Sequence, residues 1–84
     1  MDTNKIILSK SLLRKYGFMR TLVLMTVGLD GFTGSIKDLA LKTEFVSVDY
    51  MKNLICAMER EGLINRDYLR RGIYYFYRTE RNKI

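Results

Sequence analysis

The spacing of apolar residues between Ser35 and Ile64 limits the folds open to this chain, because two helical patterns follow each other with a break between them. The first pattern predicts a helix over residues 35–43, capped by Ser35, with an apolar side made of Ile36, Leu39 and Ala40. The second is capped by Ser47 and ended by Gly62, with an apolar side made of Val48, Met51, Leu54, Ile55 and Met58. The stretch therefore predicts two consecutive amphipathic helices joined by a short turn.

The second helix has one apolar face and one free face. At about 100° per residue, the centre of its apolar face falls on Met51, Ile55 and Met58. The opposite side carries Asp49, Asn53, Cys56 and Arg60, and the flanks carry Tyr50, Lys52 and Ala57. One face is thus expected to pack and the other to meet a partner.

A β-hairpin is predicted after Gly62. Residues 63–69 and 73–79 are rich in Ile and aromatic side chains, and they flank a turn made of Arg70, Arg71 and Gly72. On the return strand Ile73, Tyr75 and Tyr77 share one face, while Tyr74, Phe76 and Arg78 share the other. The aromatic set that also includes Tyr68 is expected to pack on the strand faces, with a stacking platform for single strands as the alternative.

Several residues in these elements match a known family. Leu39–Ala40 is similar to the paired Leu-Ala in the first motif helix of winged-helix regulators, and Met58–Ile64 (MEREGLI) is similar to their exit into the wing. Arg70–Tyr77 (RRGIYYFY) resembles their basic wing tip and aromatic return strand. Over about residues 20–81 the chain resembles the small winged-helix transcriptional regulators of the MarR and ArsR type. Arg78 departs from the pattern, because an apolar residue is usual there.

The resemblance implies an α+β fold, a winged helix-turn-helix of three helices plus a β-hairpin wing. We expect residues 1–84 to form a single domain, in which 35–62 are the helix-turn-helix and 63–79 the wing. Residues 1–17 form an N-terminal segment that is a candidate dimerisation element. The C-terminal dimerisation helix that is usual in the family has no counterpart in the sequence, and residues 79–84 are expected to fray.

The N-terminal third is predicted to be helical. A short helix from about Ser11 ends at Gly17, and residues 6–8 are compatible with either a brief strand or more helix. Residues 18–28 are apolar on nearly every side, which predicts a helix buried on two faces. The second face would lie inside a monomer or against a second subunit. Residues 29–34 are interpreted as a loop because two Gly and an Asp fall within them.

Charge favours an anionic partner. The chain carries fifteen Lys and Arg against nine Asp and Glu, a formal net charge of +6, and such an excess attracts polyanions such as nucleic acid. Residues 63–84 hold six basic and two acidic groups, whereas residues 35–62 hold four and five. The charge is therefore concentrated on the predicted hairpin and the N-terminal segment.

The sequence argues against catalysis and against a metal or cofactor. It has no His and a single Cys, which removes imidazole chemistry, thiolate clusters and internal disulfides. A nucleophile with its base, a carboxylate pair and a phosphate-binding glycine loop were not found. The apolar runs are too short to span a bilayer and the chain opens without a signal-peptide pattern, so we expect a cytoplasmic, nucleoid-associated protein.

Three groups of residues are predicted to bind double-stranded DNA. The recognition helix 47–61 would enter the major groove, with Asn53 as the base reader because its amide can bond adenine through two groups. The wing 69–72 would contact the flanking minor groove or backbone through guanidinium groups. The start of the first motif helix would bind phosphate. The candidate residues are Ser35, Lys37, Ser47, Tyr50, Lys52, Asn53, Arg66, Arg70 and Arg71.

The sequence therefore favours a homodimeric transcriptional regulator that binds double-stranded DNA sequence-specifically. The dimer would be held by the N-terminal third, so that two recognition helices read half-sites about 34 Å apart. Two alternatives stay open. One is a winged-helix module for protein–protein interaction, and the other is a nucleoid or replication factor that binds DNA without sequence preference.

Overall fold

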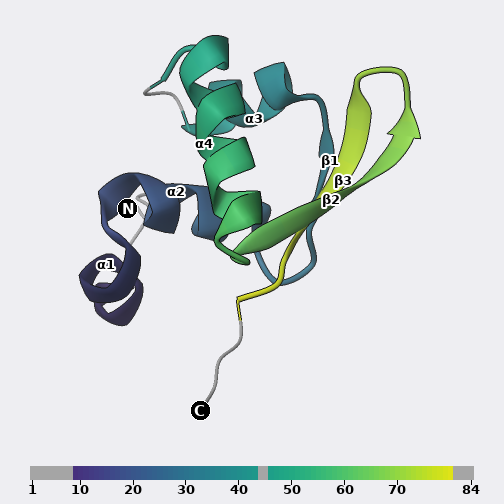
Figure 1. Ribbon diagram of the computed structural model, residues 1–84. Coiled ribbons are helices and arrows are strands. Elements are labelled where there is room, and N and C mark those ends of the chain that lie inside the picture. The colour runs from purple at the N-terminus through teal and green to yellow at the C-terminus, as the bar shows by residue number, and fades with distance from the viewer. Residues whose placement is uncertain (1–8, 44–45, 81–84) are drawn as a thin grey trace, which may run out of the picture.

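The computed structural model describes residues 9–43 and 46–80, which form a small α+β domain with four helices and a three-stranded antiparallel sheet (Figure 1). In chain order the elements are α1 (Lys10–Tyr16), α2 (Phe18–Val27), β1 (Phe32–Gly34), α3 (Ile36–Thr43), α4 (Val48–Arg60), β2 (Ile64–Arg70) and β3 (Ile73–Arg78). The short N-terminal helix predicted to end at Gly17 is confirmed as α1, and it brings the helices of the described residues to four, one more than the three of the expected fold class. The segment 6–8 lies outside the described residues.

The two consecutive amphipathic helices are confirmed as α3 and α4. The hydroxyl oxygen of Ser47 accepts the backbone N–H of Tyr50 at 3.1 Å and begins α4. The end of α4 is fixed by two bonds around Gly62: its own N–H donates to the Glu59 carbonyl, and the N–H of Leu63 donates to the Met58 carbonyl. This pair of bonds requires the left-handed backbone of Gly62, whose φ is +79°.

The sheet has the strand order β1-β3-β2. β2 and β3 form the predicted hairpin, and β1 pairs with the other edge of β3, Phe32 lying opposite Phe76. The expected loop over residues 29–34 is therefore wrong for residues 32–34. The strand is three residues long and depends on a partner far along the chain, since the Phe32 and Phe76 ring centroids lie 6.3 Å apart, so no local period marks it.

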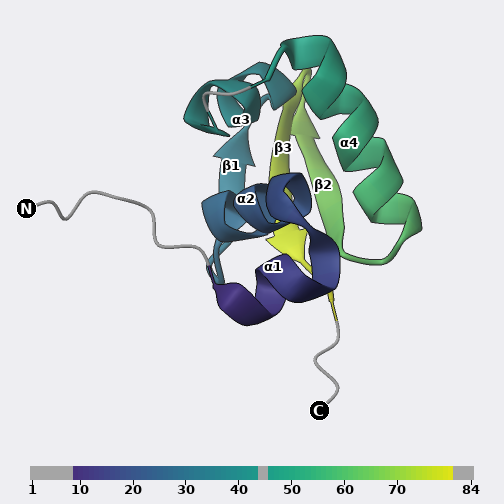
Figure 2. The same cartoon turned by 90° about the vertical axis from the view of Figure 1, so that its left-hand side faces the viewer.

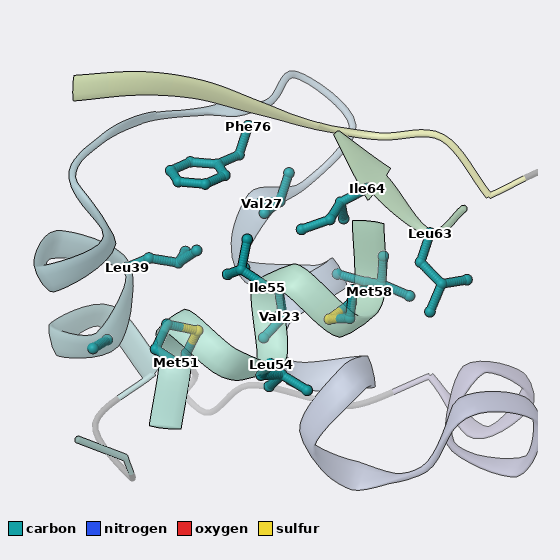
Figure 3. Close-up of a cluster of buried hydrophobic side chains, with 12 residues drawn as sticks. Val23, Val27, Leu39, Met51, Leu54, Ile55, Met58, Leu63, Ile64 and Phe76 are labelled. Carbon is teal, nitrogen blue, oxygen red and sulfur yellow. The ribbon is translucent and has the colours of Figure 1, made fainter. Parts of the chain in front are cut away.

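The core lies between the helices and one face of the sheet (Figures 2 and 3). Phe76, at the middle of β3, is fully buried there, as are Met51, Ile55 and Met58 at the predicted centre of the α4 face. Val48 was expected in the same apolar face but is 42% exposed. It is the first residue of α4 and comes before the buried residues of that helix.

α2 is the central helix. Its four consecutive residues Thr21–Leu24 are all buried, and four successive positions span most of the circumference of a helix. The prediction of a helix buried on more than one side is therefore confirmed within a single chain. α1 contributes to this cover, because Leu12 and Tyr16 pack against the core.

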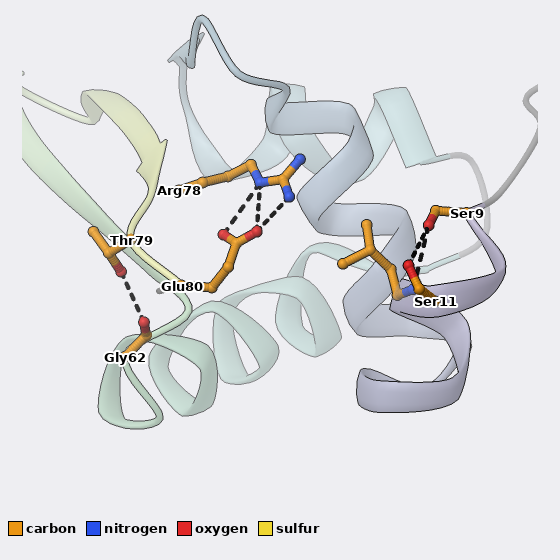
Figure 4. A network of polar contacts seen from close by, with 7 residues as sticks. Ser9, Ser11, Gly62, Arg78, Thr79 and Glu80 are labelled. Carbon is orange, nitrogen blue, oxygen red and sulfur yellow. Dashed lines mark hydrogen bonds and ion pairs between the residues drawn. The ribbon is translucent and has the colours of Figure 1, made fainter. Parts of the chain in front are cut away.

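The end of β3 is attached to the rest of the domain (Figure 4). The hydroxyl of Thr79 donates to the Gly62 carbonyl at 2.9 Å, and the guanidinium of Arg78 pairs with the carboxylate of Glu80. The expectation that the chain frays from Thr79 onward is therefore wrong for Thr79 and Glu80. Residues 81–84 lie outside the described residues.

Candidate nucleic-acid interface

α3 begins with a reciprocal pair of hydrogen bonds. The hydroxyl of Ser35 accepts the N–H of Asp38 at 3.0 Å, and the carboxylate of Asp38 accepts the N–H of Ser35 at 2.9 Å. The hydrogen bond from the Ser35 backbone N–H has the largest effect, and the side-chain hydrogen bond with Ser35 the next. Together they hold the pKa of the Asp38 carboxyl below its ordinary value. Asp38 was not among the predicted site residues, yet the spacing Ser-x-x-Asp is a known signature of this cap.

The cap changes the role of Ser35. Its hydroxyl and backbone N–H are already bonded, and a carboxylate at the start of α3 disfavours a second anion there. The predicted phosphate contact by Ser35 is therefore poorly supported. Lys37, two positions after Ser35, is exposed and stays available to an anion.

The free face of α4 is exposed as predicted. Ser47, Asp49, Lys52 and Asn53 are all exposed at or near its N-terminal half, and Tyr50 is 46% exposed. Asn53 lies opposite the buried stripe, where its amide meets solvent. This half of α4 therefore offers hydroxyl, amide, ammonium and phenol groups to a partner.

Two flanks of α4 face different parts of the domain. Glu61 follows Tyr50 by about three turns on one flank, and its carboxylate binds the guanidinium of Arg20 in α2 through bonds of 2.8 and 2.7 Å. The hydrogen bond from Arg20 lowers the pKa of the Glu61 carboxyl. On the other flank Cys56 and Glu59 contact β2, and Lys52 shares that side. Tyr50 and Lys52 therefore lie on either side of Asn53.

Arg66 is engaged within the domain. Its guanidinium donates to both carboxylate oxygens of Glu59, at 3.0 and 3.3 Å, and lies 4.8 Å from the ring centroid of Tyr74. One nitrogen is also 4.0 Å from the sulfur of Cys56. The interactions connect β2 to α4, so part of the guanidinium that was predicted to contact DNA is already bonded inside the domain. They also explain why Cys56 is half-buried although helical phase places it on the outer side.

Arg70 and Arg71 lie at the tip of the hairpin, where both are exposed. In Figure 1 the tip projects beyond the helices, and both views place it at the same end of the molecule as the N-terminal end of α4 (Figures 1 and 2). The start of α3 lies at this end as well. We call this the tip end. The elements that meet there carry the candidate residues Lys37, Ser47, Lys52, Asn53, Arg70 and Arg71.

The exposed charge at the tip end is mainly basic. Residues 35–62 have a near-neutral count, but Glu59 and Glu61 are paired with arginines from other elements and Asp38 caps its own helix. The exposed side chains of Lys37, Lys42 and Lys52 are then opposed chiefly by Asp49. The balance of charge that a partner meets is therefore more positive than the sequence count indicates.

Other kinds of site have less support in the described part of the chain. Residues 9–43 and 46–80 contain no group of His, Cys, Asp or Glu side chains that could hold a metal ion. No helix in these ranges has both the length and the apolar character to cross a membrane. An open hollow beside α3 is lined by Phe32, Thr33, Asp38, Leu41 and Lys42, where the single carboxylate is already used as a helix cap.

Comparisons of the chain with protein-family models, with curated proteins and with solved structures find no match in any of the three.

Proposed function

We propose that this protein is a winged helix-turn-helix protein that binds double-stranded DNA. In this proposal α4 is the recognition helix and the β2–β3 hairpin is the wing. The observation that carries it is the tip end itself, because the exposed amide of Asn53 and the exposed guanidinium groups of Arg70 and Arg71 lie at one end of the domain. A polar helix face suits base edges in the major groove, and guanidinium groups suit the backbone or minor groove beside it.

A selection of bound duplexes from random DNA tests the proposal. A sequence-specific regulator should enrich one motif, and binding without enrichment would favour a nucleoid or replication factor. A protein-interaction module should show no retention of duplex at moderate salt. If no duplex is retained, DNA binding is rejected.

Removing the two charges at the hairpin tip should weaken binding to every duplex. We expect Arg70→Ala combined with Arg71→Ala to flatten the slope of log affinity against log salt by about 1 to 2, because each phosphate contact contributes roughly 0.9. Titrations at several salt concentrations measure the slope. The matched control is Arg14→Ala with Lys15→Ala, which removes two exposed charges from α1. Equal slopes for the two variants would place the hairpin outside the interface.

We propose that the protein acts as a homodimer held by its N-terminal third. Leu29 at the end of α2 is 90% exposed and Leu13 in α1 is half-buried, so apolar surface remains there for a second subunit. Leu12 is unsuitable for a test because it packs against the core. Leu13→Asp should give folded monomers that bind DNA more weakly. Light scattering at micromolar concentration decides, and a monomeric unmodified protein would rule the dimer out.

A further inference from the structure

Two large apolar side chains are exposed at the end of the hairpin. Tyr68 is 67% exposed and Leu69 is 52% exposed, and they directly precede Arg70 and Arg71. The prediction that Tyr68 packs on a strand face is confirmed by its contact with Tyr74, although most of the residue stays exposed. An apolar pair next to two exposed cations is costly to leave in water and suits an anionic partner with an apolar interior.

Leu69 lies in a β-bulge near the tip. Tyr68 lies opposite Tyr74 and Arg70 lies opposite Ile73, so one extra residue, Leu69, is inserted into β2 between two paired positions. Asn65 and Asp67, at the preceding alternate positions of β2, are also exposed. Leu69 therefore stands at the tip of an exposed strand face.

The stem of the hairpin is rigidly supported from the tip to the core. The ring of Tyr68 packs edge-on against Tyr74 at 6.1 Å, and Tyr74 packs against the buried ring of Phe76 at 5.8 Å. Arg66 lies over Tyr74 and is bound to Glu59 of α4. A row of packed aromatic rings therefore connects the tip to the domain core.

We propose that the hairpin tip is a wedge that bends duplex DNA, with Leu69 inserted between base pairs in the minor groove and Arg70 and Arg71 on the adjacent phosphates. Apolar side chains inserted at a base step unstack it and kink the duplex, provided that the protein side is stiff and cations hold the backbone. Residues 66–76 supply the apolar side chain in Leu69, the support in the packed rings of the stem, and the cations in Arg70 and Arg71. The inference rests on the proposed DNA binding, and it adds an activity, the bending of DNA, to recognition.

Charge complementarity selects DNA over the other candidate, an anionic membrane. A lipid surface would also accept a leucine, a tyrosine and two arginines. The tip, however, lies at the same end of the domain as the start of α4. The exposed face of α4 carries Lys52 and Asn53 beside the apolar surface of Val48 and Tyr50, and this largely polar face suits a second groove of the same duplex better than lipid. The wedge should prefer flexible pyrimidine–purine steps, which unstack at least cost.

Fluorescence energy transfer between dyes at the two ends of a short duplex measures the bend. At saturating protein, the unmodified chain should bend the duplex by at least about 20°. Leu69→Ser should abolish the bend while affinity stays within about tenfold, because the phosphate contacts remain. Leu41→Ser is the matched control, since it changes another exposed leucine, in α3, and it should leave the bend intact.

Four results would overturn the wedge. A duplex that stays straight with unmodified protein bound, or an equal bend with Leu69→Ser, removes the wedge and leaves the proposed DNA binding standing. Absence of any duplex binding by the unmodified protein removes both. The fourth result uses vesicles of phosphatidylserine and phosphatidylcholine: if Leu69→Ser abolishes binding to them and leaves DNA bending unchanged, the tip is a membrane anchor.

Discussion

Phe76→Ala is expected to destabilise the domain by about 3 to 5 kcal/mol, the usual cost of removing a fully buried phenylalanine. Phe76 is 0% exposed, and it packs on the β1 ring of Phe32 and on Tyr74. Small domains are stable by only about 5 to 15 kcal/mol in total, so much of the variant should be unfolded at room temperature. Circular dichroism during urea unfolding measures the loss.

Tyr77→Ala is the control for Phe76→Ala. Tyr77 is the next residue in β3, points to the opposite face of the sheet, is half-buried and stacks on Tyr75 with ring centroids 5.5 Å apart. Its removal should cost about 1 kcal/mol, the scale of one aromatic pair. A larger loss for Tyr77→Ala than for Phe76→Ala would mean that β3 faces the helices with the other set of side chains.

Gly31→Ala should cost about 2 to 4 kcal/mol because two penalties add, one from the backbone and one from overpacking. The φ of Gly31 is +88°, and a Cβ placed there would lie 2.4 to 2.6 Å from ring atoms of Tyr75. The ring cannot move without loss, since its hydroxyl donates to the Asp30 carbonyl at 2.9 Å. Urea unfolding gives the free energy.

Two comparisons separate the penalties at Gly31. Gly62→Ala has a similar φ with nothing within 4 Å of the new Cβ, so it should show the backbone penalty alone, about 1 to 2 kcal/mol. Adding Gly31→Ala to a Tyr75→Ala background should cost this smaller amount. If Gly31→Ala costs no more than Gly62→Ala in the unmodified background, the close contact with Tyr75 does not constrain the loop.

The helices and the hairpin could be predicted because their signals are local. Ser47 and Gly62 act on backbone groups within one turn of themselves, and the stripe of Met51, Ile55 and Met58 repeats at the helical period. The alternation that placed Phe76 and Tyr77 on opposite faces depends only on the pleat of the strand. Such features need no knowledge of what lies across the molecule.

The missed features depend on distant partners. β1 is a strand only because Phe32 pairs with Phe76 of β3. Arg66 binds Glu59 only because the fold places β2 next to α4. Val48 fits the apolar period of α4 but is exposed at the very start of the helix. Tyr68 packs on Tyr74 as predicted, but its high exposure could not be predicted, because exposure depends on where the helices stop covering the hairpin.

For the candidate site, the sequence identified side chains but not their availability. Asn53, Lys52, Arg70 and Arg71 are exposed, as the helical phase and the turn predicted. Ser35 and Arg66 were chosen for the same chemistry, yet each is already bonded inside the domain. The capping partner of Ser35 was readable from the spacing to Asp38, whereas the partners of Arg66 required the fold.

The first helix and the last strand leave the domain on the side away from the tip end. In both views α1 begins, and β3 ends, at the opposite end of the molecule from the hairpin tip and the start of α4 (Figures 1 and 2). The domain can therefore be tethered through either end of the described chain, to a sensor chip, a bead or a fused reporter, with the tip end directed toward solution. Immobilisation by a tag should thus leave its contacts with a soluble partner unobstructed.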